Sequence, residues 1–202
     1  MPILAIAFER IQFPNARKKM SFFQTTRKAA DVMSLFKRFP KAVKPLLEYH
    51  DIVLREDNSA FSIGERELIA AYVSSLNGCE YCFTAHRRYA EAFGIDPSVF
   101  EADSIVFDWN VLPMKLAPVF EYVRKLTVSP KSVEQSDADA VFAEGWDDDA
   151  LFDAISICAL YSFMNRIVEG SGIKEYRDAN RLSPSAMRSF RYVNILRLID
   201  TE

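Results

Sequence analysis

The sequence predicts an all-α fold, and three observations support this. Only six glycines and nine prolines occur among the 202 residues. Apolar residues recur at steps of three and four positions, as on one face of a helix, and do not alternate as along a strand. Half of the residues are hydrophobic, which is enough to fill the core of one globular domain over residues 1–202.

The helices are predicted in chain order from their periodicity and end signals. The stretch up to about Pro14 is ambiguous, because IAFERIQF also fits an extended segment. Ser62 and Glu65 form a capping box that begins a helix over 63–76, and Asn77-Gly78 ends it. Asn77 with Glu80 then caps a helix that runs to about 93. The other predicted helices cover 25–36, 40–55, 99–101, 113–127, 136–143, 148–169 and 183–198.

Charge and hydropathy exclude several classes of partner. The net charge is -3 and the pI is about 5.6, so no basic field attracts a nucleic-acid backbone. The first residues lack the pattern of a signal peptide. No window approaches the roughly 18 apolar residues of a membrane span, and the best one runs only from Ala154 to Phe163. A soluble, cytoplasmic protein without nucleic-acid or membrane partners is expected.

The motif that indicates chemistry is a CxxC pair followed by a histidine. Cys79, Cys82 and His86 recur at three- and four-residue steps, so on a helix they line one stripe. A thiol attacks peroxide or disulfide only as the thiolate, and it needs a group that lowers its pKa and a second thiol to resolve the product. The motif offers both, which indicates a redox-active dithiol.

Glu67 joins this group through the predicted turn. If 63–76 and 79–93 form a helical hairpin at Asn77-Gly78, Glu67 and His86 lie at similar heights on its two arms, with an offset of roughly 3 Å. A carboxylate behind an imidazole orients it and raises its basicity.

Two effects point to different attacking thiols. The helix N-terminus favours a thiolate at Cys79, by about 0.3–1 kcal/mol. Cys82 has His86 one turn away, and a positioned base contributes about 10²–10⁴-fold. We therefore predict Cys82 as the nucleophile and Cys79 as the resolving thiol.

The run ERELIAAYVSSLNGCEYCFTAH resembles the signature of the alkylhydroperoxidase D-like (AhpD-like) family within the carboxymuconolactone decarboxylase superfamily. Glu67, Cys79, Cys82 and His86 all match it. The likeness extends over about 40–175, where the later part resembles the peroxidase-related branch and includes the pair Asn165-Arg166.

This resemblance implies an all-helical, homo-oligomeric oxidoreductase that reduces peroxides. A Glu–His relay would activate the second cysteine, and a redox-active disulfide would follow. The substrate would be a hydroperoxide and the electron donor an external dithiol or protein thiol, with no cofactor and no metal. Tyr81 stands where the type member has a histidine, so the relay here rests on His86 and Glu67.

Other interpretations remain open from the residues alone. The protein could be a disulfide carrier for a partner peroxidase, or a non-catalytic helical binding or redox-sensing protein. Cys82 and His86 also have the spacing of half a zinc site, with His50 and Cys158 as the remaining soft ligands.

Four further features have structural expectations. Cys158, in an apolar run, is expected to be a buried small hydrophobe. Asn165 and Arg166 suggest a buried structural contact. AHRRYAEAFGI at 85–95 and NRIVEGSGI at 165–173 end alike, which suggests a degenerate duplication of a helical hairpin. In the C-terminal helix, a solvated basic face is expected at Arg188, Arg191 and Arg197.

Overall fold

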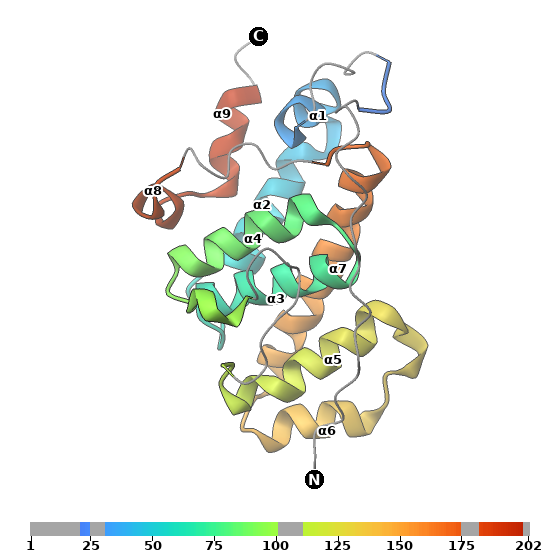
Figure 1. Ribbon diagram of the computed structural model, residues 1–202, viewed down its shortest axis with the longest axis vertical. Helices are drawn as coiled ribbons and strands as arrows, with labels where there is room; N and C mark the ends of the chain where they lie inside the picture. Colours follow the sequence, from blue (N-terminus) through green and yellow to red (C-terminus); the bar gives the residue numbers. More distant parts are fainter. Residues whose placement is uncertain (1–20, 25–30, 101–110, 175–181, 200–202) are drawn as a thin grey trace.

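The computed structural model of the protein describes residues 21–24, 31–100, 111–174 and 182–199. Its regular elements are helical, and these residues contain no strand, which confirms the all-α prediction. The α-helices are α1 Val32–Arg38, α2 Val43–Arg55, α3 Ile63–Leu76, α4 Glu80–Ala92, α5 Ala117–Val128, α6 Gln135–Ala143, α7 Asp148–Gly170, α8 Pro184–Arg188 and α9 Leu196–Ile199 (Figure 1). Short 3-10 turns are η1 Pro40–Ala42, η2 Pro97–Val99, η3 Met114–Leu116, η4 Pro130–Ser132 and η6 Tyr192–Ile195.

Most predicted helices occur within a few residues of their expected bounds. The helices predicted over 40–55 and 113–127 each begin as a 3-10 turn, η1 and η3, before α2 and α5. Near 99–101 the described residues form only the turn η2. The ambiguous stretch before Pro14, and residues 25–30 of the first predicted helix, lie outside the described residues.

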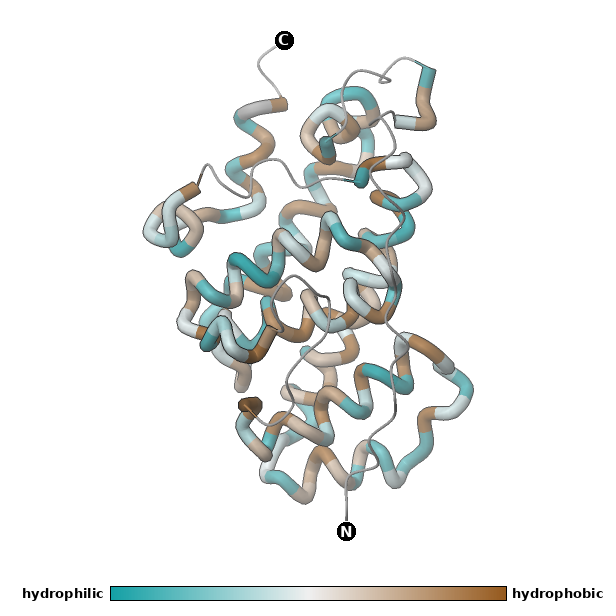
Figure 2. The backbone as a smooth tube through the Cα atoms, in the orientation of Figure 1, coloured by the Kyte–Doolittle hydropathy of each residue, from teal (hydrophilic) through white to brown (hydrophobic). Residues whose placement is uncertain are grey.

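Helix α3 is the centre of the molecule, in contact with α4, α5 and α7 (Figure 1). It is apolar on nearly every side, and its middle turns are fully buried. A helix that is hydrophobic all round needs neighbours on every face, and α2 adds a further one. Figure 2 marks the hydrophobic residues along the backbone in brown. Helix α3 is thus enclosed by its neighbours, and α4 packs along it.

The α3–α4 hairpin forms at the predicted turn but is capped differently. The capping box of Ser62 and Glu65 is present at the start of α3. Gly78 has a φ of 68°, the left-handed region that favours glycine. Asn77, however, is the C-cap of α3 and does not cap α4. The N-cap of α4 is Cys79, so α4 begins one residue after the first cysteine.

The open ends of the hairpin also approach closely. A Cβ atom added to Gly64, in the first turn of α3, would lie 3.0 Å from the carbonyl oxygen of Phe93 beyond α4. Glycine therefore permits the start of α3 to pass against the end of α4. The register between the two helices is fixed at both ends.

The single C-terminal helix predicted over 183–198 is wrong, because the segment breaks into α8, η6 and α9. The physical reason is Asp51 on α2, whose carboxylate accepts hydrogen bonds from the backbone N–H groups of Tyr192 (2.7 Å) and Val193 (3.0 Å). This carboxylate acts as a helix N-cap supplied from another element, so a new helical turn begins at Tyr192.

The basic face predicted on this segment has a structural role in part. Arg188 donates to the carbonyl of Ala92, the last residue of α4, and Arg191 donates to the carbonyl of Arg55, the last residue of α2. Carbonyls at helix C-termini lack partners within their own helix, so the C-terminal segment fastens two helix ends.

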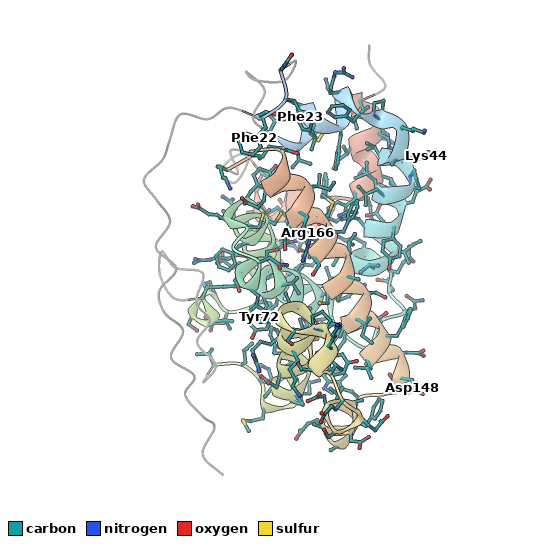
Figure 3. All side chains as sticks on the ribbon, turned by 90° about the vertical axis from the view of Figure 1, so that its right-hand side faces the viewer. Phe22, Phe23, Lys44, Tyr72, Asp148 and Arg166 are labelled. Carbon is teal, nitrogen blue, oxygen red and sulfur yellow. The ribbon has the colours of Figure 1, made fainter. Side chains whose placement is uncertain are left out.

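Helix α7 runs along the face that Figure 3 turns to the viewer, with Arg166 and Asp148 on it. By length and composition it meets the criterion for a membrane-spanning helix, contrary to the sequence expectation. The core helix of a soluble protein passes the same criterion, and half of the apolar window of α7 is buried in the molecule. A glycine of positive φ lies two residues beyond the last residue of each helix, Gly94 after α4 and Gly172 after α7. The similar sequences at 85–95 and 165–173 therefore share a helix-ending motif. The duplication itself stays a prediction.

Candidate functional site

Cys79 and Cys82 lie at the N-terminus of α4, where the chain has just left α3. Both thiols are free and buried: Cys79 is 0% exposed and Cys82 is 4% exposed. They form a small apolar cluster with Leu35, Val168 and Ile173, apart from the main core. The pair is thus shielded from water by α1 and the end of α7.

The two sulfurs influence each other's acidity in opposite directions. Interaction with the side chain of Cys82 lowers the pKa of Cys79, although burial raises it. The same interaction, followed by burial, raises the pKa of Cys82 well above its ordinary value. In the resting dithiol, therefore, Cys79 is the more acidic thiol, as its place at the helix N-terminus also favours. The assignment of Cys82 as nucleophile stays a prediction.

Asn165 on α7 connects the dithiol to the hairpin turn. Its amide nitrogen donates to the hydroxyl of Ser74 (3.1 Å), and its amide oxygen accepts from Asn77 (3.0 Å). Asn165 also lowers the pKa of both cysteines, although its effect is smaller than those of burial and of the interaction between the two cysteine side chains. The sequence predicts a structural contact for this residue, and in the structure it also lies beside the thiols. Its separation of more than 80 positions from the motif hides that proximity in the sequence.

Glu67 and His86 meet across the hairpin, as the predicted turn requires. The distance from Nδ1 of His86 to Oε2 of Glu67 is 2.5 Å, and both side chains are buried. A carboxylate can only accept, so Nδ1 carries the proton and Nε2 is the free basic nitrogen. Tyr161 of α7 packs its ring edge-on against the imidazole, with 4.2 Å between centroids. The imidazole is therefore held in one orientation and one tautomer.

A third residue, Arg55 at the end of α2, pairs with the other oxygen of Glu67. Its Nη1 forms an ion pair with Oε1 of Glu67, and the side chain is 2% exposed. Burial raises the pKa of Glu67, but Arg55 and His86 together bring it below its ordinary value. The carboxylate is thus ionised although it has no exposed surface. Nothing in the sequence distinguishes Arg55 from an ordinary basic residue at a helix end.

The structure brings the predicted residues together as two pairs. Cys79 and Cys82 form one pair, and Glu67 and His86 form the other. No hydrogen bond joins the imidazole to either sulfur in the described part of the chain; the link is α4, on which His86 follows Cys82 by one turn.

The half-site for zinc gains no further ligands from the fold. Among the described residues, no three His, Cys, Asp or Glu side chains lie close enough together to hold a metal ion. His50 donates through Nδ1 to the carbonyl of Leu46 (2.7 Å) and packs near Tyr161. Cys158 is buried beside the hydroxyl of Thr127, as expected for a small core residue.

Comparison with known proteins identifies related sequences and folds. Residues 40–101 match the model of the Carboxymuconolactone decarboxylase family, a segment that includes α2, α3 and α4. No curated protein sequence matches the chain.

Two crystal structures share the fold. One is the alkylhydroperoxidase AhpD core of an uncharacterized peroxidase-related protein from Ralstonia eutropha JMP134, with 23% identity and a TM-score of 0.64 over 76% of this chain and 78% of that one. The other is an uncharacterized peroxidase-related protein from Silicibacter sp. TM1040, with 22% identity and a TM-score of 0.63 over 70% of this chain and 74% of that one. As its sequence predicts, this chain has an all-helical fold like that of these two structures, and its residues 40–101 are similar to the Carboxymuconolactone decarboxylase family.

Proposed function

We propose that this protein is a thiol-dependent peroxidase that uses Cys79 and Cys82 as a dithiol. The observation that carries the proposal is the buried Glu67–His86 pair, one helical turn from Cys82 on the same hairpin. A buried base with one free nitrogen beside a free dithiol suits proton transfer during thiol chemistry. The family segment and the AhpD-like fold support the same class of activity.

In the proposed cycle, the proton of the Cys82 thiol passes to Nε2 of His86. The thiolate attacks the peroxide, the O–O bond breaks, and the products are a Cys82 sulfenic acid and an alkoxide that recovers the proton as an alcohol. The Cys79 sulfur then attacks Cys82, water leaves, and a disulfide forms. An external dithiol reduces this disulfide by exchange and becomes oxidised itself.

Cys82 is proposed as the attacking thiol on grounds of access and base position. Cys79 has no exposed surface, whereas Cys82 retains a little and lies one turn from His86. The low pKa of Cys79 suits its second role, because the resolving step also requires a thiolate.

The test is peroxide consumption by purified protein with a dithiol present. Wild type should consume an alkyl hydroperoxide, and Cys82→Ser should lose the activity. Cys158→Ser is the control, because Cys158 is a core residue outside the motif. Equal rates for wild type and Cys82→Ser would refute peroxidase activity. Thiol exchange with a partner protein and no peroxide turnover would identify a disulfide carrier.

We also propose that the protein is a homo-oligomer and that the outer face of α7 contributes to the interface. Phe152 and Phe163 are 67% and 49% exposed and lie three helical turns apart on one face, with Ala159 between them. Ile52 on the neighbouring α2 is exposed as well. Large exposed apolar side chains that share one face indicate a surface that packs against another chain.

A further inference from the structure

A group of buried ionisable residues extends behind His86, away from the cysteines. α2, α3, α4 and the C-terminal segment come together there (Figure 1). Arg55 and Glu67 form an ion pair within this group, and both are almost completely buried. The titratable and charged groups that face them are His50, Asp51, Arg66, His86, Tyr89, Tyr161 and Tyr192.

Aromatic rings surround the guanidinium of Arg55 in place of water. Its central carbon lies 5.2 Å from the ring centroids of Tyr89 and Phe93 and 5.1 Å from that of Tyr192. Its Nε and Nη2 atoms are buried without a hydrogen-bond partner, and Nη1 reaches Glu67 and the carbonyl of Leu54. Within the described residues, Glu67 is the carboxylate that pairs with this cation.

The charges of the three linked side chains determine how many protons the group holds. With Arg55 positive and Glu67 negative, the group is neutral when the His86 imidazole is neutral. Without Arg55, a buried Glu67 carboxylate would be uncompensated, and the Glu67–His86 pair would take up one proton to restore neutrality. An imidazole that already holds this proton cannot accept another from a thiol.

The neighbouring Arg66 shows that burial of an arginine here does not by itself imply this role. It is also 2% exposed, but its guanidinium donates to the backbone carbonyls of Val53 (3.3 Å) and Glu56 (2.8 Å). Arg66 thus holds the end of α2, whereas Arg55 faces the carboxylate of the relay. The two residues form a matched pair for an experiment.

We propose that Arg55 is a positioning residue: its fixed charge keeps Glu67 ionised and His86 neutral, with Nε2 free to take a proton. The consequence for activity rests on the proposed thiol chemistry, but the protonation state does not. The C-terminal segment contributes by placing Tyr192 on the guanidinium and by fastening the carbonyl of Arg55 through Arg191.

The direct test follows the protonation of His86 by ¹⁵N NMR of the imidazole as a function of pH. The chain has two histidines, so His50→Gln assigns both signals. In Arg55→Met, the pH midpoint for His86 should rise by about one pH unit or more, the range of a nearby charge. Arg55→Lys keeps the charge and should shift it much less. Arg66→Met, the matched control, should shift it less than Arg55→Met does, because the guanidinium of Arg66 donates to backbone carbonyls.

Two results would overturn the proposal: an unchanged midpoint in Arg55→Met, or an equal shift in Arg66→Met. If Arg55→Met does not fold, Glu67→Gln and the double variant Arg55→Met/Glu67→Gln provide the same test. In Glu67→Gln, the Arg55 cation acts on His86 without a counter-ion. The pH midpoint for His86 in Glu67→Gln should therefore lie about one pH unit or more below the midpoint in the double variant. Equal midpoints would contradict the role of Arg55.

Peroxide turnover separates this proposal from the proposed function. If turnover occurs, Arg55→Met should lose rate at neutral pH and recover it at higher pH, because an imidazole that already holds a proton cannot accept one from the thiol. A shifted midpoint in a protein without peroxide turnover would support the role of Arg55 and refute the peroxidase. If wild type turns over peroxide but Arg55→Met shows no shifted midpoint for His86, only the role of Arg55 is refuted.

Discussion

At the scale of single residues, acidity and access favour different cysteines for the first step. Interaction with Cys82 lowers the pKa of Cys79, but the side chain of Cys79 is completely buried. We expect peroxide to form a sulfenic acid on Cys82 in the variant Cys79→Ser, trapped by a sulfenic-acid reagent and located by mass spectrometry. The variant Cys82→Ser should remain unlabelled. Labelling in Cys82→Ser alone would assign the attack to Cys79.

His50 gives the folded protein a specific dependence on pH. Burial lowers the pKa of His50 from 6.5 to about 4, although its bond to the Leu46 carbonyl opposes the shift. Between these values the unfolded chain binds a proton that the folded protein does not, so stability decreases as pH falls from 6.5 to 4. The loss approaches about 3 kcal/mol, at 1.36 kcal/mol per pKa unit.

Urea unfolding at several pH values checks this effect. The free energy of unfolding of wild type should fall over that pH interval, and His50→Gln should remove most of the decrease. The low pKa of Glu67 contributes separately, because its stabilisation is lost only below the ordinary value of 4.5. An equal slope in wild type and His50→Gln between pH 6.5 and 4.5 would contradict the assignment to His50.

The sequence predicts contacts well where both residues belong to one local motif. Glu67 and His86 lie on either side of a turn whose position Asn77-Gly78 indicates, so their distance follows from helix geometry. Arg55 and Asn165 reach the same site from α2 and α7. Their places depend on how helices pack in three dimensions, which no spacing along the chain encodes.

At the scale of elements, the α3–α4 hairpin depends on the left-handed residue at its turn. A Cβ atom added to Gly78 would meet no other atom within 4 Å, so Gly78→Ala should cost only the conformational penalty, about 1–2 kcal/mol. Gly170, in the last turn of α7, has similar space but no positive φ, so Gly170→Ala is the matched control and should be neutral or stabilising. Thermal unfolding compares the two variants, and equal effects would contradict this account.

The C-terminal segment shows why element bounds can fail although the periodicity is right. Residues 183–198 have helical spacing and a proline at the first position, which predict one helix. Asp51 offers its carboxylate to the amides of Tyr192 and Val193, and this tertiary contact outweighs the local preference. A capping residue that lies about 140 positions earlier leaves no signal near the break.

At the scale of the whole molecule, the exposed face of α7 predicts self-association. Phe152→Lys/Phe163→Lys should shift the mass measured by light scattering toward that of the monomer, because two buried charges would oppose the packing of this face. Met114→Lys is the control, since Met114 is 76% exposed on η3. A monomeric wild type, or an oligomer that the double variant leaves intact, would contradict an interface on α7.

If Cys79 and Cys82 form a redox-active dithiol, a single turnover should link them. One equivalent of alkyl hydroperoxide is added to the reduced protein, and intact-mass and peptide analysis follow the thiols. The protein should lose two hydrogen atoms, Cys79 and Cys82 should become linked, and Cys158 should remain a thiol. Reduced Cys79 and Cys82 after the peroxide has been added, with the peroxide unconsumed, would contradict a redox-active dithiol.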